Sequence, residues 1–281
     1  MAPLNELPFV KGHGTGNDFV IIRDLDNQVD LAPEQVRFLC DRRRGIGADG
    51  VLRVVRSASV PELGSSAGAA EFYMDYRNAD GSLAEMCGNG ARVFIRYLDA
   101  VGLVTDAEVT FATRDGLHSA TINADRTVTI DMGRASALAA DLAPVVTVGE
   151  RSWPATGVAA PNPHAVVFVE DLADAGSLAQ SPDVTPREAF PDGVNVEFVR
   201  REGAGHVAMR VHERGVGETM SCGTGACAVA WVVLGGATGA PGEVIVDVPG
   251  GAVRVTRTDD ERLLLTGPAD LVARGTVLLP A

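Results

Sequence analysis

Basic residues are scarce in this sequence, and their scarcity excludes one class of partner. Lys and Arg together number 24 against 37 Asp and Glu, which gives a formal net charge of −13. Nucleic-acid binding depends on Lys and Arg side chains that displace counterions from phosphates. We therefore expect no nucleic-acid partner, and the same charge disfavours an anionic membrane surface.

The sequence also lacks targeting and membrane-spanning signals. Its first residues, MAPLNELPFVKGHG, have no basic start followed by an apolar run and no small-residue cleavage site, so we expect a cytoplasmic location. The uncharged stretch Thr219–Gly242 is long enough to cross a membrane. However, it holds six glycines and one proline, and its only sustained apolar run is Ala226–Leu234, which predicts a buried helix.

Cysteine is rare, and its spacing excludes two kinds of site. The four cysteines, at positions 40, 87, 222 and 227, form no Cys-x-x-Cys pair and have no histidines at the spacing of zinc ligands. We predict neither a metal site nor a disulfide framework, and no cofactor motif is present. In a reducing cytosol, a cysteine is then either a small core residue or a working thiol.

Chain length and hydrophobic periodicity predict two domains of the α+β class with mostly antiparallel strands. The 281 residues exceed one typical domain of roughly 100 to 200 residues. A helix opens on Pro33 and covers 33–42, and a hairpin turns at Gly250 and Gly251. Alternation of apolar and polar residues predicts strands at 18–24, 71–78, 164–170, 194–200, 206–213 and within 243–257.

The two halves of the chain repeat the same order of features. Asn17 precedes a strand and lies 70 residues before Cys87, whereas Asn162 precedes another strand and lies 60 residues before Cys222. The difference equals the length of Pro61–Ala70, a Pro/Gly/Ser/Ala-rich segment that is typical of a surface loop. We therefore predict two structurally similar halves.

Each half places a cysteine directly before a Gly-x-Gly-Ala step. The two segments read MCGNGAR (86–92) and SCGTGAC (221–227), and each follows a strand and a polar turn and precedes a predicted helix. Free N–H groups at a helix N-terminus stabilise a thiolate and can hold a carboxylate, and glycines leave that backbone open. This pattern suits removal of a proton next to a carboxylate.

The duplicated thiol favours one shared site over two separate ones. A free thiol has a pKa near 8.5, and a decrease of roughly 1.5 units, about 2 kcal/mol, leaves it about half ionised at neutral pH. Two thiolates in one dry pocket repel, so the pair holds one proton, as a two-base inversion requires. A lone cysteine at a helix start is more often a packing residue, but the duplication indicates catalysis.

These motifs resemble those of the diaminopimelate epimerase family. The resemblance implies two pseudo-symmetric α+β domains, each of mixed, mostly antiparallel sheet around a central helix, with a cofactor-free active site in the cleft between them. It covers both halves of the chain in the family's order. The matching segments are GHGTGNDF, RRRGIGADG, NADGSLAEMCGNGARVF, PNPHAV, GVNVEFV, HERGVGETMSCGTGACAVA, VDVPGG and LTGPA.

The resemblance also implies an activity and an assembly. Such enzymes interconvert L,L- and meso-diaminopimelate, for bacterial lysine and peptidoglycan synthesis, and are usually homodimers. We place the first domain at 1–132 and the second at 133–267, with the join in the weakly patterned stretch Asp131–Pro144. The resemblance implies that the last strand, about 268–281, packs on the first domain.

Individual residues acquire roles through the same resemblance. Cys87 corresponds to the thiol that donates a proton and Cys222 to the thiolate that removes one, with the roles exchanged in the reverse direction. His164 and Glu213 correspond to residues that tune the cysteines. The reacting carboxylate is held by the amides of Gly88, Asn89, Gly223 and Thr224. The corresponding substrate contacts are Asn17, Asn78, Asn162, Asn195, Glu213 and Arg214.

Side-chain chemistry agrees with these roles but leaves simpler ones open. Asparagine donates and accepts hydrogen bonds, and Arg214 can grip a carboxylate bidentately. Asn78, within RNADGS, suits a turn equally well, Glu213 with Arg214 could form a surface pair, and His164 a satisfied strand end. One contact does not transfer, because this chain has Gly50 where some relatives have a glutamine.

Three other functions are compatible with some of these residues. A proline or hydroxyproline racemase also uses paired cysteines, but it leaves the asparagines and HERGVGET unexplained. A thiol hydrolase with His164 as base needs only one of the cysteines. A redox-switched binding protein would join Cys87 to Cys222 in a regulatory disulfide.

Overall fold

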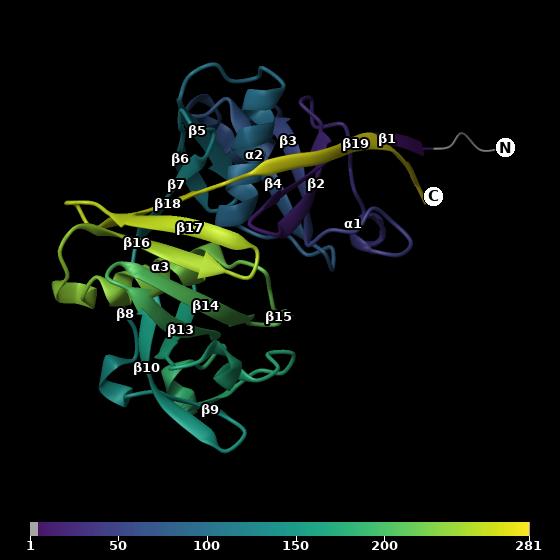
Figure 1. Cartoon of the computed structure of the whole chain (residues 1–281). Helices are drawn as coiled ribbons and strands as arrows, with labels where there is room; N and C mark the ends of the chain where they lie inside the picture. Colours follow the sequence, from purple (N-terminus) through teal and green to yellow (C-terminus); the bar gives the residue numbers. More distant parts are fainter. Residues whose placement is uncertain (1–4, 281) are drawn as a thin grey trace. The chain divides into compact units, whose positions relative to one another are not determined.

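The computed structural model describes residues 5–280, and the chain divides into two units, coloured along the sequence in Figure 1. Unit 1 contains Met1–Ile130 together with Pro268–Ala281, and unit 2 contains Asp131–Gly267. Each unit combines strands of mixed direction with one long helix, which confirms the predicted α+β class.

The elements of unit 1, in chain order, are β1 (Asn5–Gly14), β2 (Asn17–Arg23), α1 (Pro33–Cys40), β3 (Gly50–Arg56), η1 (Ser57–Ser59), η2 (Pro61–Gly68), β4 (Phe72–Asn78), α2 (Gly88–Ala100), β5 (Glu108–Thr113), β6 (Gly116–Ile122), the start of β7 (Val128–Arg134) and β19 (Asp270–Leu279). Those of unit 2 are β8 (Ser136–Ala137), η3 (Ala140–Leu142), β9 (Val145–Val148), β10 (Arg151–Ala159), β11 (Pro163–Phe168), η4 (Leu172–Ala175), β12 (Asp183–Thr185), η5 (Arg187–Ala189), β13 (Asn195–Gly203), β14 (His206–Glu213), β15 (Gly217–Glu218), α3 (Gly223–Val233), η6 (Gly236–Thr238), β16 (Gly242–Val248), β17 (Gly251–Arg257) and β18 (Arg262–Gly267).

Strand pairing follows the same succession of directions in both units. Successive pairs from β1 to β7 are antiparallel, parallel, antiparallel, parallel, antiparallel and antiparallel. The strands β10, β11, β13, β14, β16, β17 and β18 repeat that succession. A parallel pair needs a crossover connection, and α2 and α3 lie in the equivalent crossovers after β4 and β14. The two halves of the chain therefore fold alike.

The burial pattern of the strands reflects how the helices pack against them. In β2 the residues from Phe19 to Ile22 are all buried, because α1 packs on one face and α2 lies on the other. In β14 only alternate apolar residues, Val207, Met209 and Val211, enter the core around α3. Helix α3 is buried along most of its length, as its uninterrupted apolar run predicted. Among residues 5–280, no helix combines the length and apolar character needed to span a membrane.

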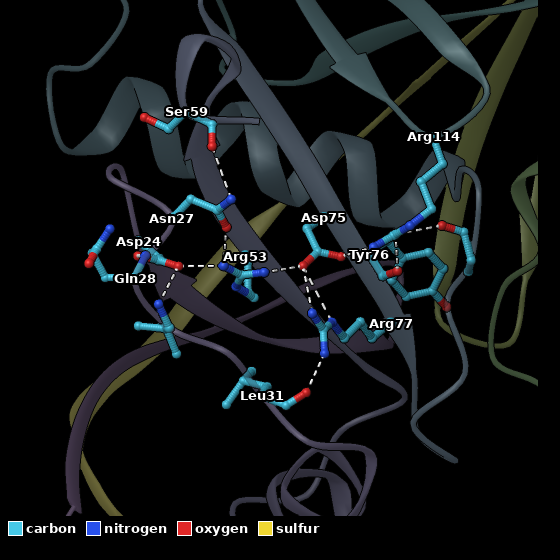
Figure 2. Close-up of polar contacts among 12 residues, drawn as sticks. Asp24, Asn27, Gln28, Leu31, Arg53, Ser59, Asp75, Tyr76, Arg77 and Arg114 are labelled. Carbon is cyan, nitrogen blue, oxygen red and sulfur yellow. Dashed lines mark hydrogen bonds and ion pairs between the residues drawn. The ribbon is translucent and has the colours of Figure 1, made fainter. Parts of the chain in front are cut away.

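A buried network of charges fixes strands β3 and β4 of unit 1 (Figure 2). Arg53 lies between Asp24 and Asp75, and its Nη1 donates to Asp75 Oδ2 at 2.6 Å. Arg77 and Arg114 converge on the same Asp75 carboxylate. Burial alone would raise the pKa of Asp75, but the hydrogen bond from Arg114 and the three guanidinium charges lower it. Arg114 also donates to the carbonyls of residues 76 and 84, which holds the turn that leads toward Cys87.

The last strand of the chain belongs to unit 1. Strand β19 pairs antiparallel with β1 from Asn5–Leu279 to His13–Asp270, and Figure 1 draws the yellow β19 beside the purple β1. The buried guanidinium of Arg92, on α2, donates to the carbonyl of Pro268 just before this strand.

Three local predictions need correction. Helix α1 ends at Cys40, because the Asp41 side chain accepts hydrogen bonds from the backbone N–H groups of Arg43 and Arg44 and starts a turn. The hairpin turn consists of residues 249 and 250, since Val248 pairs with Gly251. The segment Pro61–Ala70 was predicted to be a loop but mostly forms the 3₁₀ turns of η2, whose Leu63 packs on a small apolar cluster.

Candidate active site

Each glycine-flanked cysteine caps a helix, as the sequence predicted. Cys87 has extended backbone angles (φ −140°, ψ 119°) and its carbonyl accepts the first helical bond of α2, from Ala91 at 2.7 Å. Cys222 has similar angles (φ −121°, ψ 112°) and accepts from Ala226 of α3 at 2.9 Å. Because each cap follows the strand β4 or β14, the two thiols occupy equivalent places in the two units.

In unit 1 the predicted residues Asn17, Cys87 and Asn89 lie together. The Asn17 amide oxygen accepts from the Cys87 thiol at 3.7 Å and from Asn89 Nδ2 at 3.2 Å. The Asn17 amide nitrogen donates to Asp49 at 2.7 Å, which fixes the orientation of the amide group. An asparagine oxygen therefore faces a half-buried thiol at the start of α2.

The strand that carries Asn17 is held by neighbouring charges. Asp18 pairs with Lys11 at 2.9 Å and with Arg42 at 2.7 Å. Burial of the Asp18 carboxyl acts to raise its pKa, but the bonds from Arg42 and Lys11 outweigh it and lower the pKa to about 2. Behind them, Arg92 of α2 donates to the Thr15 hydroxyl at 3.0 Å. The turn before Asn17 is therefore anchored to the same helix that Cys87 caps.

Two positions of unit 1 have local structural roles. Asn78 Nδ2 donates to the Ser82 hydroxyl at 3.0 Å and its backbone closes the turn with residues 81 and 82, so its turn role is realised. At Gly50 an added Cβ would lie 2.7 Å from the Tyr76 ring and 2.7 Å from the Arg77 carbonyl. A side chain at position 50 would therefore clash with Tyr76 and with the backbone of β4.

In unit 2 the Cys222 thiol is buried among polar groups. Its sulfur accepts from the Gly225 N–H at 3.4 Å and lies 3.4 Å from the Thr224 hydroxyl. Glu213, at the end of β14, forms hydrogen bonds with Thr219 and with Cys222. The structure thus joins the predicted pair Glu213 and Cys222, and adds Thr219, which the sequence interpretation did not single out.

The ionisation of this cluster differs from the expectation for a helix start. Burial raises the pKa of Cys222 well above its usual value, and the negative charges of Glu213 and Glu197 raise it further. The Thr224 hydroxyl and the Gly225 N–H act in the opposite direction but do not offset these effects. Burial also raises the pKa of Glu213. In the absence of substrate, the pKa of Cys222 is therefore shifted upward, opposite to the lowering that a helix start alone would give.

His164 forms a fully buried pair with Glu197, a residue absent from the sequence prediction. The Nδ1 atom of His164 lies 2.7 Å from Glu197 Oε1, and both side chains have no exposed surface. Period-two alternation puts Glu197 on the same face of β13 as Asn195, and that signal was available in the apolar run VNVEFV. A carboxylate within such a run indicates a specific partner.

The remaining predicted contacts lie just before β11, at the start of β13 and after β14. Asn195 donates to the Pro163 carbonyl at 3.1 Å and accepts from the Arg214 N–H at 2.9 Å, so it ties these segments together. The Arg214 guanidinium is exposed and donates to the Asp192 carbonyl at 2.8 Å. Asn162 is exposed beside them, and its backbone carbonyl accepts from Ala160. The helix-start residues Gly88, Asn89 and Gly223 are buried, and Thr224 is half-buried.

Comparison with known proteins gives a family match over most of the chain. A sequence model of the family described as diaminopimelate epimerase matches residues 9–138 and 157–272. The chain is 54% identical to a diaminopimelate epimerase of Streptomyces coelicolor, over 96% of this chain and 94% of that protein. It is 46% identical to a diaminopimelate epimerase of Corynebacterium glutamicum, over 96% and 98%.

Solved structures share the fold at much lower sequence identity. A hydroxyproline epimerase from Agrobacterium vitis superposes with a TM-score of 0.70 at 16% identity, covering 99% of this chain and 94% of that one. A Bacillus anthracis phenazine biosynthesis protein of the PhzF family superposes with a TM-score of 0.67 at 17% identity, covering 98% and 100%. At these identities the similarity establishes the fold alone.

Proposed function

Because the chain belongs to the diaminopimelate epimerase family, we propose that it interconverts L,L- and meso-diaminopimelate through two thiols that act on opposite faces of one carbon. The observation that carries the mechanism is the repeated cap, since Cys87 and Cys222 occupy equivalent helix starts in two similarly folded units. A mechanism with a single base would give no role to one of the two capping cysteines.

The helix starts provide the second requirement, which is stabilisation of negative charge beside the reacting carbon. Removal of the α-proton pushes electron density onto the substrate carboxylate. We infer that this group docks on the helix-start N–H groups of Gly88 and Asn89 and on those of Gly223 and Thr224, where the helix dipoles favour an anion. The asparagines and Arg214 then suit the amino and carboxylate groups at the far end of the substrate.

The raised pKa values in unit 2 suggest how Cys222 becomes a base. Its thiol needs a proton acceptor, and Glu213 is hydrogen-bonded to it and has a raised pKa, so the carboxylate accepts a proton more readily than an exposed one does. The substrate's ammonium group adds a positive charge that favours the thiolate. Cys222 then takes the α-proton while Cys87 delivers its own proton to the opposite face. Before the next turnover, Glu213 releases its proton to solvent and Cys87 regains one.

The activity is tested by incubating the protein with L,L-diaminopimelate in deuterium oxide and following both the α-proton and the stereoisomer ratio. We expect deuterium at the α-carbon together with formation of the meso isomer. Exchange with proline but none with diaminopimelate would instead identify a racemase of cyclic amino acids. Absence of exchange with either substrate would favour the hydrolase or binding functions.

We also propose a cytoplasmic homodimer. The mechanism requires both thiols to stay reduced, which a reducing compartment ensures. Strand β19 exposes the apolar side chains Val272 (55%) and Leu278 (48%), which suits it to face a second copy of the chain. Sedimentation of the wild-type protein and of a variant with both residues replaced by serine tests this assembly, since the variant should dissociate. An unchanged dimer in the variant would place the interface elsewhere.

A further inference from the structure

Unit 2 contains a buried carboxylate, that of Glu197, which has no role in the proposed chemistry. Glu197 is the third residue of β13, between Val196 and Phe198, and has no exposed surface. Burial of a carboxylate is costly unless it is paired and hydrogen-bonded. Its Oε1 atom has one such bond, from His164 Nδ1 at 2.7 Å, whereas Oε2 has no partner among the described residues.

The partner ring is left with one unused nitrogen. His164 is also fully buried, and its Nε2 atom has no hydrogen-bond partner among residues 5–280. An ionised carboxylate only accepts hydrogen bonds, so its contact with Nδ1 requires the proton on that nitrogen. The pair therefore fixes the ring orientation and leaves Nε2 as the hydrogen-bond acceptor of the neutral ring.

The helix behind the pair is shaped to admit the carboxylate. A Cβ atom at Gly225, in the first turn of α3, would lie 2.7 Å from Glu197 Oε1 and 3.3 Å from the Cys222 sulfur. Only the absence of a side chain at this position lets the carboxylate approach the capped end of the helix. Glu197 therefore reaches the helix start that carries the thiol.

The surrounding titratable groups come from each element packed against Glu197. They are His164 on β11, Glu213 at the end of β14 and Cys222 before α3. The charges of Glu197 and His164 both act on Glu213, and that of Glu197 also acts on Cys222. These contacts make one electrostatic unit of four side chains.

We propose that Glu197 is a positioning residue that holds His164 with Nδ1 protonated, so that Nε2 is the ring nitrogen available to accept a hydrogen bond during epimerisation. This inference rests on the proposed function. Glu197 touches neither thiol's reacting face nor substrate, so it acts on the ring through its hydrogen bond and on Cys222 through its charge. Its removal should therefore affect turnover more than substrate affinity.

The first test uses the wild-type protein and needs no substrate. With ¹⁵N-labelled histidine, protonated and unprotonated ring nitrogens give separate NMR signals, and the His164→Gln variant assigns one ring among the five histidines. We expect Nδ1 of His164 to carry a proton across the neutral pH range. An unprotonated Nδ1 in this range overturns the proposal, whatever the activity of the enzyme.

The second test compares Glu197→Gln with a matched control on the same strand. A glutamine keeps the shape but both donates and accepts, so it no longer selects the tautomer. We expect kcat to fall at least about tenfold with KM within about twofold, and the Nδ1 signal to lose its full protonation. Glu202→Gln should change neither, because Glu202 pairs with Arg200 away from this cluster.

The outcomes separate a positioning role from a structural one. A purely structural Glu197 would lower the melting temperature of the Gln variant while leaving kcat and the histidine signals as in the wild type, and that result overturns the proposal. If wild-type protein shows the expected Nδ1 behaviour but no exchange with diaminopimelate, the proposed function fails independently of the Glu197–His164 geometry.

Discussion

The two helix starts share a backbone geometry but surround their thiols differently. Cys87 is half-buried and faces the neutral amide oxygen of Asn17. Cys222 is buried, is bonded by the Gly225 N–H and lies in the field of two carboxylates. The same local sequence step therefore produces two chemical environments, because the residues that set the thiol's ionisation come from other strands.

The difference indicates a division of labour. In the proposed mechanism, a buried thiol with a raised pKa needs a proton acceptor before it can act as a base, and Glu213 of the same unit is hydrogen-bonded to it. A thiol next to an asparagine has a polar neighbour without charge. Each prediction below changes one side of this comparison.

The largest effect is expected from removal of either thiol. Cys87→Ala and Cys222→Ala should each lower kcat for epimerisation by at least about 100-fold, the lower end for a positioned acid or base. The matched control is Cys40→Ala, since burial raises the pKa of Cys40 to about 12 and makes it an inert core thiol. Initial rates of meso-isomer formation measure the loss. Wild-type rates in either of the first two variants would remove the two-thiol mechanism.

Asp75→Asn should destabilise unit 1, the unit that carries Cys87. The change leaves three guanidinium groups around a neutral side chain, and breaking a buried ion pair of this kind costs about 3–5 kcal/mol. The free energy of unfolding in urea measures the effect. Asp247→Asn is the control, because its pair with His206 is exposed and should contribute less than about 1 kcal/mol.

The same network predicts the direction of acid sensitivity. Despite burial, the arginine contacts lower the folded-state pKa values of Asp24 and Asp75 below those in the unfolded chain. Their stabilisation is therefore complete above about pH 4 and is lost as the pH falls through the folded values. Asp75→Asn should flatten this acid limb. An identical pH dependence in both proteins would show that the network does not control it.

Much of the site was predictable because it depends on local patterning. The caps at Cys87 and Cys222, the strands and the repeated order of features all follow from residues close in sequence. The role of Glu197 and the ionisation of Cys222 were not predictable in this way. They depend on β11, β13 and β14 packing around α3, and a helix-terminus argument alone gives the wrong direction for the thiol. The hairpin turn was predicted one residue too far along the chain, because strand register sets its position.

A glycine-to-alanine pair compares the two helix starts directly. Gly225→Ala should lower kcat/KM at least about tenfold, because its methyl group displaces Glu197 and the Cys222 side chain. Gly90→Ala, at the equivalent position of α2, meets only the edges of Phe19 and Leu52 at 3.3–3.4 Å and should change activity by less than about threefold. Alanine favours a helix at both positions, so propensity does not explain a difference. Equal losses in the two variants would contradict the asymmetry.

The smallest expected change is a shift in the pKa of the Cys222 thiol. Glu213→Gln removes a negative charge beside Cys222, so the pKa of this thiol should decrease from its raised value. The thiolate absorbance, titrated in this variant and in Glu213→Gln/Cys222→Ser, isolates the change. An unaltered titration would mean that the charge of Glu213 does not contribute to the raised pKa.

The most direct test of two thiols acting on one carbon is the distribution of deuterium early in the reaction. With L,L-diaminopimelate in deuterium oxide, a two-base mechanism predicts that the first meso product carries solvent deuterium at the inverted carbon, while the recovered L,L substrate remains almost fully protiated. Early deuterium in the unconverted substrate at the same level as in the product would show that a single base serves both faces.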